Sequence, residues 1–377
     1  MLSERLRQAR LASGLTLRAL AQKAGTVSAA AISKYESGKD RPRQAVLVSI
    51  ARALNIPLDR LLTLPSVDLA VVEYRKKKNL PDCASETIMA RVKSDLESYI
   101  DLSELLSSRG APLFDTSVAF TKVIDNLTEV DEYASALRDS WSLGRDPIRS
   151  VVETVEDAGA KVITIDADSR FDELACIANG KYPVIVLKSL RPGKGDRQRF
   201  NVLHGLGHLL LCPGEGIDKE KMCHRFAASM LAPREAALKR LGVKRRDLDI
   251  DYELPKLKEE FGMSIKAWVI RAWDLGVINN ATRDSLFKRI SQKGWNQDEP
   301  VPIPIETPSR FELMVSQARA EGIITPVRAA ALMGGLRRKP HARLSEMSIP
   351  AQADDDYVAG GPLDSWDDIE PRGPIHA

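Results

Sequence analysis

The sequence lacks several features that mark membrane and secreted proteins. Across its 377 residues, no apolar run approaches the roughly 20 residues needed to cross a bilayer. Met1 leads directly into the charged segment Ser3–Arg10, so we expect no signal peptide. The four cysteines form no Cys-x-x-Cys pair, which argues against a disulfide framework. These absences together predict a protein of the reducing cytoplasm with no membrane association.

The net charge of +3 conceals a strong asymmetry between the two ends of the chain. Residues 1–65 hold eleven Lys and Arg against four Asp and Glu, a balance of +7. Residues 350–377 hold one Arg against seven Asp and Glu, a balance of −6. A basic segment favours a polyanionic partner, and an acidic end rich in Gly and Pro is typical of a disordered tail.

Residues 1–65 have the pattern of a five-helix bundle. Thr16 and Ser28 are placed to cap two short helices, Leu17–Ala24 and Ala29–Glu36, and Gly25 separates them. Two short helices around a glycine turn are typical of the unit that lays its second helix in the major groove of DNA. We therefore predict a helix-turn-helix DNA-binding domain.

Two segments closely resemble the phage-repressor (XRE) type of helix-turn-helix. They are Leu17-Arg-Ala-Leu-Ala-Gln-Lys-Ala-Gly25 and Ala31-Ile-Ser-Lys-Tyr-Glu-Ser-Gly38. That resemblance implies a homodimer on a double-stranded DNA operator. It directs toward the groove the side chains of Ser28, Ala29, Ala30, Ser33 and Lys34, and it places near phosphates those of Arg18, Lys39, Arg41 and Arg43. Alanine cannot make a bidentate hydrogen bond to a base, so we expect modest sequence specificity.

A second motif lies in the middle of the chain, at Phe200-Asn-Val-Leu-His204-Gly-Leu-Gly-His208. Histidines four residues apart share one face of a helix and can bind one zinc ion together. Zinc peptidases use the spacing His-Glu-x-x-His, in which the glutamate takes a proton from the metal-bound water. Here the glutamate position is Gly205. The sequence therefore predicts a zinc site without its usual general base.

A zinc site of this kind needs a third protein ligand, commonly a carboxylate from an adjacent helix. A helix is expected from about Asp218 onward, and Glu220 is the first candidate. His224 lies one turn further along the same face and could replace or support Glu220, and Cys223 is a third choice. Two glutamates could act as a substitute base if the fold brings either near the metal, namely Glu215 and Glu173.

The remaining patterns predict a mainly α fold with a small β-sheet, that is, an α+β fold. A small antiparallel sheet is expected to pack against the His204 helix. Its strands are the β-branched runs Lys161–Ile165 and Pro183–Leu187, with a third strand or loop over Phe171–Gly180. Ala70–Lys78 ends in a basic run that could begin a new domain, contact phosphates or simply be solvated. Further helices are expected over Ala84–Leu106, Asp131–Asp157, Arg234–Leu241, Leu254–Phe261, Ser264–Leu275, Ala281–Gln292 and Phe311–Met333.

The segment from Arg197 to Pro233 resembles the ImmA/IrrE family of zinc metallopeptidases, in which a His-Glu-Leu-Gly-His helix precedes a second ligand helix. That resemblance implies a zincin-like fold with zinc held by His204, His208 and Glu220, and it leaves Gly205 in place of the catalytic glutamate. The domains expected in order are a helix-turn-helix domain (1–65), a helical connector (66–128), a metallopeptidase-like domain (129–240), C-terminal helices (241–335) and a disordered acidic tail (336–377).

Family members fused to such a helix-turn-helix regulate phage, stress-response or toxin–antitoxin operons. The expected function is therefore a transcriptional regulator whose zinc domain senses a ligand or docks a partner such as a toxin or a repressor. One alternative is an active zinc endopeptidase that cleaves a repressor or antitoxin. Another is an adaptor in which both domains bind proteins.

Overall fold

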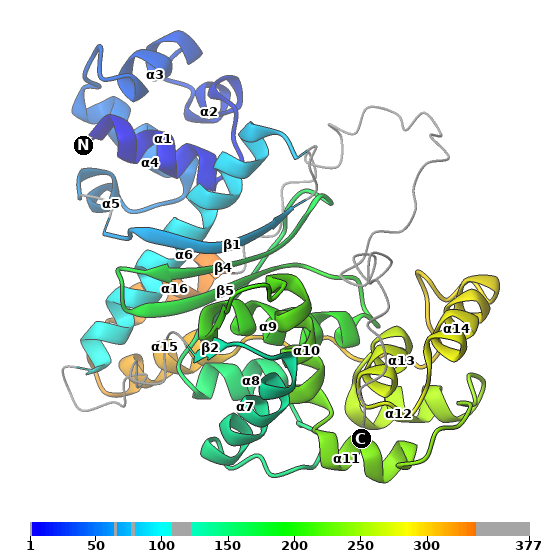
Figure 1. Cartoon of the computed structure of the whole chain (residues 1–377). Coiled ribbons are helices and arrows are strands. Elements are labelled where there is room, and N and C mark those ends of the chain that lie inside the picture. The colour runs from blue at the N-terminus through cyan, green and yellow to red at the C-terminus, as the bar shows by residue number, and fades with distance from the viewer. Residues whose placement is uncertain (1, 64–65, 77–79, 108–121, 337–377) are drawn as a thin grey trace.

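The computed structural model describes residues 2–63, 66–76, 80–107 and 122–336 (Figure 1). The expected disordered tail lies outside these residues from position 337 on, and so does the end of the basic run at 77–79. The described chain is mainly helical with small sheets, which confirms the α+β fold class.

Five short helices form the N-terminal bundle, as the sequence predicts. Their bounds are α1 Leu2–Ala12, α2 Leu17–Ala24, α3 Ala29–Glu36, α4 Gln44–Leu54 and α5 Leu58–Leu62. Thr16 accepts a hydrogen bond from Ala19 N, and Ser28 accepts one from Ala31 N, so both predicted caps are confirmed. Leu6, Leu20 and Ile32 are fully buried at the centre, where one helix alone could not shield them from water.

The main sheet is mixed, which corrects the expectation of an antiparallel one. It contains β1 Leu69–Lys76, β3 Lys161–Ile165, β4 Phe171–Ala178 and β5 Tyr182–Lys188, in the order β1-β4-β5-β3. The turn at Asn179 and Gly180, both at positive φ, joins β4 and β5 as a hairpin. Because β4 already occupies one edge of β5, β3 pairs with the other edge and runs parallel to β5.

Strand β1 was not expected as part of this sheet. It pairs antiparallel with β4 along its whole length, so the run from Ala70 onward is an edge strand of the central domain. The residues expected as a helical connector therefore contribute both this strand and the long helix α6 Asp82–Ser107. β2 Lys122–Ile124 forms a separate parallel pair with β6 Leu211–Pro213.

Successive side chains of β4 point to opposite faces of the sheet, and two helices cover these faces. Leu174 and Cys176 pack in one apolar cluster with the α6 side chains Val92 and Leu96. Ala175, which lies between them in sequence, belongs to the cluster that contains α9 Gly195–Leu210. The sheet thus separates α6 from the helix that carries the two histidines, as Figure 1 shows.

The other helices surround α9 or follow it in sequence. Their bounds are α7 Leu127–Ser140, α8 Val151–Asp157, α10 Lys219–Leu231, α11 Arg234–Leu241, α12 Glu253–Phe261, α13 Ile265–Asp274, α14 Asn280–Gln292, α15 Arg310–Ala320 and α16 Pro326–Leu336. The expected helix over Asp131–Asp157 is therefore two helices, and its break contains Gly144 at φ 59°. Within the described ranges, no helix combines the length and apolar character needed to cross a membrane.

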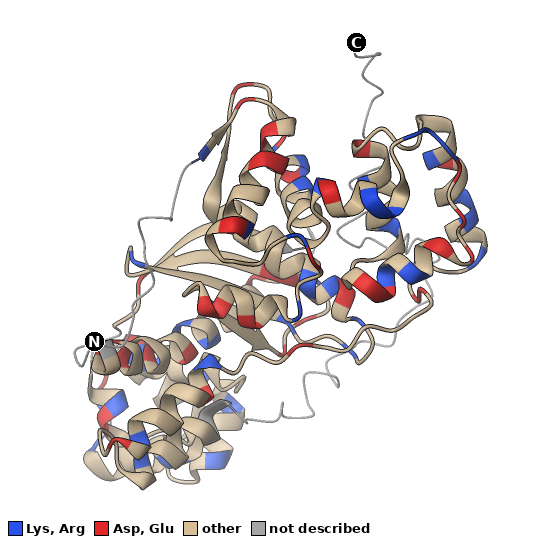
Figure 2. Ribbon diagram, turned by 90° about the horizontal axis from the view of Figure 1, so that it is seen from below, with Lys and Arg blue, Asp and Glu red and all other residues tan. Residues whose placement is uncertain are grey.

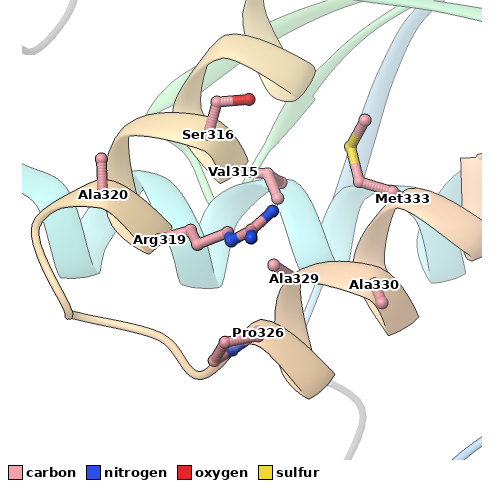
Figure 3. Close-up of a pocket in the computed structure, with 8 residues that line it drawn as sticks. All are labelled: Val315, Ser316, Arg319, Ala320, Pro326, Ala329, Ala330 and Met333. Atoms are coloured by element: carbon pink, nitrogen blue, oxygen red, sulfur yellow. The ribbon is translucent and has the colours of Figure 1, made fainter.

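Helix α6 contacts three separate parts of the molecule. Its Glu97 forms an ion pair with Arg5 of α1, and its apolar side chains cover the sheet. Its Tyr99 packs edge to face against Phe311 of α15, with ring centroids 5.2 Å apart. A groove of about 550 Å³ lies between α15 and α16, and it is lined by Arg319 and by apolar side chains such as those of Val315 and Met333 (Figure 3).

Candidate metal centre and DNA-binding surface

Helix α9 is buried along its whole length and carries His204 and His208 one turn apart. Their ring centroids are 4.6 Å apart and their planes are nearly perpendicular. The first turn of α10 brings Glu220 to the same place, because Asp218 caps that helix by accepting a hydrogen bond from Lys221 N. We call these three residues, His204, His208 and Glu220, the His–His–Glu cluster.

The spacing within the His–His–Glu cluster suits a zinc ion. One Glu220 oxygen lies 3.3 Å from His204 Nε2, and the other lies 3.3 Å from His208 Nε2. Zinc bonds of about 2.0–2.2 Å in a tetrahedron separate the donor atoms by about 3.3–3.6 Å. Each Glu220 oxygen therefore lies at a zinc-like donor separation from one imidazole nitrogen, Oε2 from that of His204 and Oε1 from that of His208.

Buried donor atoms without hydrogen bonds support the same conclusion. His204 and His208 are almost completely buried, and neither Nε2 atom makes a well-aligned hydrogen bond in the described part of the chain, although a Glu220 oxygen lies 3.3 Å from each. A buried polar atom without a partner costs about 1–3 kcal/mol. A bound cation would satisfy both nitrogens at once, so the residues present fit a metal ion.

The opposite nitrogens of the two imidazoles have partners of their own. Glu173 of β4 lies 2.5 Å from His204 Nδ1, and Cys223 Sγ lies 3.4 Å from His208 Nδ1. A carboxylate of β1, Glu73, lies 3.9 Å from the same His208 Nδ1. Such contacts retain the proton on Nδ1 and leave Nε2 available to a metal.

Electrostatics around the cluster reflect burial and these contacts. Burial disfavours the charged form of His204, but Glu173 outweighs that effect and raises the pKa of His204. Burial lowers the pKa of His208. Burial acts to raise the pKa of Glu220, yet contact with the two imidazoles holds that pKa below its ordinary value. The charge of the Glu220 carboxylate and the imidazoles of the two histidines therefore attract one another even without a metal.

Gly205 packs directly against the sheet. A Cβ atom at this position would lie 3.3 Å from Ile185 Cγ2 and 3.9 Å from Ala175 Cβ. Of the two expected substitute bases, the fold brings Glu173 beside the cluster, where its carboxylate groups with both histidines. Glu215 is exposed and Glu173 contacts His204 Nδ1, the nitrogen directed away from Glu220.

The other two ligand candidates lie at different positions around the cluster. Cys223 faces His208 Nδ1, and burial raises the pKa of its thiol. His224 is buried beside His204, with ring centroids 4.6 Å apart, and burial lowers its pKa well below the ordinary value. One donor atom each from His204, Glu220 and His224 lie within 4.8 Å of one another.

The residues expected to contact DNA lie at the surface of the N-terminal bundle. Ala29 is half-buried and the others are exposed, namely Arg18, Ser28, Ala30, Ser33, Lys34, Lys39, Arg41 and Arg43. Ser28 also serves as the cap of α3, so its hydroxyl is already engaged. Figure 2 shows several Lys and Arg positions along the helices of this bundle, and basic side chains are what phosphate contacts use.

Sequence reasoning missed one residue near the metal centre, Glu73. From sequence alone, its segment, Ala70–Lys78, is a basic run of uncertain role. Pairing of β1 with β4 brings Glu73 to the cluster. The alternation of the apolar Val72 and Tyr74 with the charged Glu73 and Arg75 was a signal for a strand that could have placed it.

Comparison with protein families gives two matches on separate parts of the chain. Residues 6–61 match the helix-turn-helix family model, and residues 155–272 match the model of the IrrE N-terminal-like domain of peptidase family M78. The second match includes the whole His–His–Glu cluster. No match was found among curated proteins or among solved structures.

Proposed function

Because the chain fuses an XRE-type helix-turn-helix domain to an IrrE-like, metallopeptidase-like domain, we propose that it is a transcriptional regulator with a non-hydrolytic zinc centre. The regulator acts in the cytoplasm as a homodimer on a double-stranded DNA operator, for example of a phage, stress-response or toxin–antitoxin operon. Its central domain senses a ligand or docks a protein partner, such as a toxin or a repressor.

The DNA-binding part of the proposal rests on helix α3 and its surroundings. Ser33 and Lys34 project from the exposed face of α3, and Ile32 anchors the opposite face in the bundle core. Lys39 and Arg41 follow the helix and would meet phosphates on either side of the groove. Because α3 offers Ala29 and Ala30 to the bases, binding draws mainly on phosphate contacts and apolar contacts to thymine.

The metal part of the proposal rests on the His–His–Glu cluster. Bound there, zinc would hold the two imidazoles and the carboxylate together and so join α9 to α10. Glu173 holds the Nδ1 proton of His204 and fixes the direction of its ring. Position 205 offers no group that could accept a proton from water, and general-base catalysis is typically worth ~10²–10⁴-fold in rate.

One observation carries the proposal of a non-hydrolytic centre. Gly205 lies between the two histidines in sequence, and Ile185 occupies the space next to its Cα. The chain therefore has donor atoms at zinc-like spacing, and Ile185 packs where the side chain of a glutamate at position 205 would start. This arrangement favours recognition over hydrolysis.

DNA binding is tested by selecting fragments from a genomic library with the full chain and measuring affinity by fluorescence anisotropy. Ser33→Ala and Lys34→Ala should each weaken binding to the selected fragment. Arg52→Ala, an exposed basic position on α4, serves as the control and should have little effect. Equal binding by all four proteins would contradict the proposal that α3 reads the operator.

Peptidase activity is tested on zinc-loaded protein with a peptide library and the products of neighbouring genes, read by mass spectrometry. The native chain should release no fragments. Gly205→Glu is examined alone and with Ile185→Ala, which removes the side chain that crowds position 205. Cleavage by the native chain that disappears in His204→Ala would instead establish the alternative function, an active zinc endopeptidase.

A further inference from the structure

His224 lies next to the His–His–Glu cluster and has no role in the function proposed so far. It follows Glu220 by four residues on α10, so both side chains share one face of that helix. Only 1% of His224 is exposed. Its ring lies 4.6 Å from that of His204 and 5.8 Å from that of Phe200, measured between centroids.

The position of the His224 imidazole is compatible with metal binding. Donor atoms of His204, Glu220 and His224 all lie within 4.8 Å of one another. Around tetrahedral zinc the donors are about 3.3 Å apart, so each distance would shorten by at most about 1.5 Å. Binding of one ion by these donors therefore requires the side chains of His224 and Glu220 to shift by a distance of that order.

We propose that His224 is a fourth protein ligand of the zinc ion, and that it closes the metal centre to water. This inference rests on the proposed zinc centre and adds its coordination number. Catalytic zinc sites use three protein ligands and reserve the fourth position for water or substrate, whereas structural sites use four. With His224 bound, the ion joins α9 to α10 and has no position for a nucleophile.

This coordination explains why His224 and Gly205 occur together. An open position would expose a zinc-bound water next to a site that has no base to use it. A third imidazole removes that water and makes the ion a cross-link between two helices. The region then serves as a metal-dependent structural element of the regulator.

Zinc K-edge X-ray absorption on the full-length native protein tests the proposal directly, because it counts the imidazoles around the ion. The expected result is three imidazoles and one carboxylate oxygen. His224→Phe should show two imidazoles, and its ring can still stack on Phe200. Two imidazoles in the native protein would overturn the proposal. A zinc–sulfur distance near about 2.3 Å would also overturn it, in favour of Cys223.

Cobalt substitution provides a second, independent measurement. Thiocyanate added to the cobalt-loaded native protein should leave its visible spectrum unchanged, because no coordination position is open. The same addition to His224→Phe should shift the spectrum. Cys223→Ser, a change at the adjacent position, is the matched control and should behave like the native protein. A spectral shift in the native protein would contradict the closed coordination.

Zinc affinity separates this proposal from folding and from the function on which it rests. His224→Phe should bind zinc more than about 100-fold less tightly, beyond the ~10–100-fold loss typical of an outer-sphere partner. Thermal unfolding of the metal-free proteins shows whether the variant folds. A native chain that binds no zinc would refute the proposed metal centre, whereas zinc with two imidazoles refutes only the role of His224.

Discussion

Single residues determine which nitrogen each histidine presents at the metal centre. The Glu173 carboxylate lies 2.5 Å from His204 Nδ1, on a strand whose neighbouring side chains pack in the core. Only 1% of Glu173 is exposed, so bulk solvent does not solvate its carboxylate. A buried carboxylate is costly unless it is paired, and here the partner is the imidazole that it orients.

Replacing Glu173 with Gln should weaken zinc binding by ~10–100-fold, because the amide holds the Nδ1 proton less firmly than the carboxylate does. Competition with a chromophoric chelator measures the change. Asp172→Asn is the matched control, since the adjacent Asp172 pairs with Arg197 and Lys188. Equal zinc affinities in the two variants would show that Glu173 does not orient His204.

Gly205→Glu should destabilise the native fold by about 1–3 kcal/mol, since its Cβ would lie 3.3 Å from Ile185 Cγ2 in a buried helix. Ile185→Ala on its own should cost about 2–5 kcal/mol through the cavity that it leaves. The double variant should lose less stability than the two single losses combined, because the new side chain fills that cavity. Additive losses in chemical denaturation would mean that the two positions do not compete for space.

Among the elements, α6 carries the contacts between the N-terminal bundle and the central domain. Arg5 Nη1 of α1 lies 2.5 Å from Glu97 Oε1, and both side chains are less than one tenth exposed. Arg60 of α5 donates a hydrogen bond from its Nη2 to Ser98 Oγ of α6 at 2.5 Å. The DNA-binding helices are thereby attached to a helix that also forms one layer of the sheet domain.

Glu97→Ala should destabilise the protein by about 3–5 kcal/mol, because it leaves the buried Arg5 charge without its carboxylate partner. The Arg7–Glu86 pair joins the same two helices but is about half exposed, so Glu86→Ala should cost at most about 1 kcal/mol. Thermal unfolding of both variants measures the contrast. Similar effects for both would indicate that burial does not distinguish the pairs.

The contact between α8 and the start of α15 should depend on pH. Burial raises the pKa of Glu156 to about 7 from 4.5, and its carboxylate accepts hydrogen bonds from Ser309 N and Arg310 N. The folded protein thus holds this proton more tightly than the unfolded chain. The stabilisation is fully present below about pH 4.5 and is lost as the pH rises through about 7.

Glu156→Gln stays neutral and escapes that loss, so its free energy of unfolding should rise relative to the native protein between pH 5 and 8. The limit is about 3 kcal/mol, which corresponds to the full pKa difference. Denaturation at several pH values measures the trend. Asp157→Asn, at an exposed neighbouring position, should show no such trend, and a constant difference for Glu156→Gln would contradict the interpretation.

At the scale of the whole molecule, the basic N-terminal bundle and the two histidines of α9 lie in separate regions. The basic bundle lies at one end, and helix α9, which carries the two histidines, lies across the sheet from α6 (Figure 1). Strand β1 connects these regions, because it follows the bundle in sequence and brings Glu73 to the cluster. The chain segment that leaves the bundle thus also contributes a carboxylate beside the two histidines.

Operator binding by the full chain should weaken steeply with salt, with log K linear in log salt concentration. Each phosphate contact contributes about 0.9 to the slope, so Lys39→Ala and Arg41→Ala should each reduce its magnitude by about that amount. Anisotropy titrations over a range of salt concentrations provide the slopes. Lys239→Ala, on α11 far along the chain, should leave the slope unchanged. A salt-independent affinity would favour the adaptor function instead.

Much of this architecture follows from local sequence signals. Hydroxyl caps at Thr16 and Ser28, the helical spacing of apolar residues and the glycine between α2 and α3 act within a few residues of chain. Every helix that apolar periodicity predicts in the C-terminal third is present, from α11 to α16. The spacing of His204 and His208 is equally local, because four residues complete about one helical turn.

Tertiary structure decided what no local pattern could. The parallel pairing of β3 with β5 depends on which edge β4 leaves open, and the role of β1 depends on pairing across about a hundred residues. The proximity of Glu73, Glu173 and His224 to the two histidines likewise requires strands and helices that are distant in sequence to pack together. By itself the sequence determined the helices, the exposed basic bundle and the pair of imidazoles, because these depend on short-range geometry. The donor spacing, the carboxylate behind His204 and the wall beside Gly205 arise only when the sheet and α10 close around α9, since burial and long-range contacts create them.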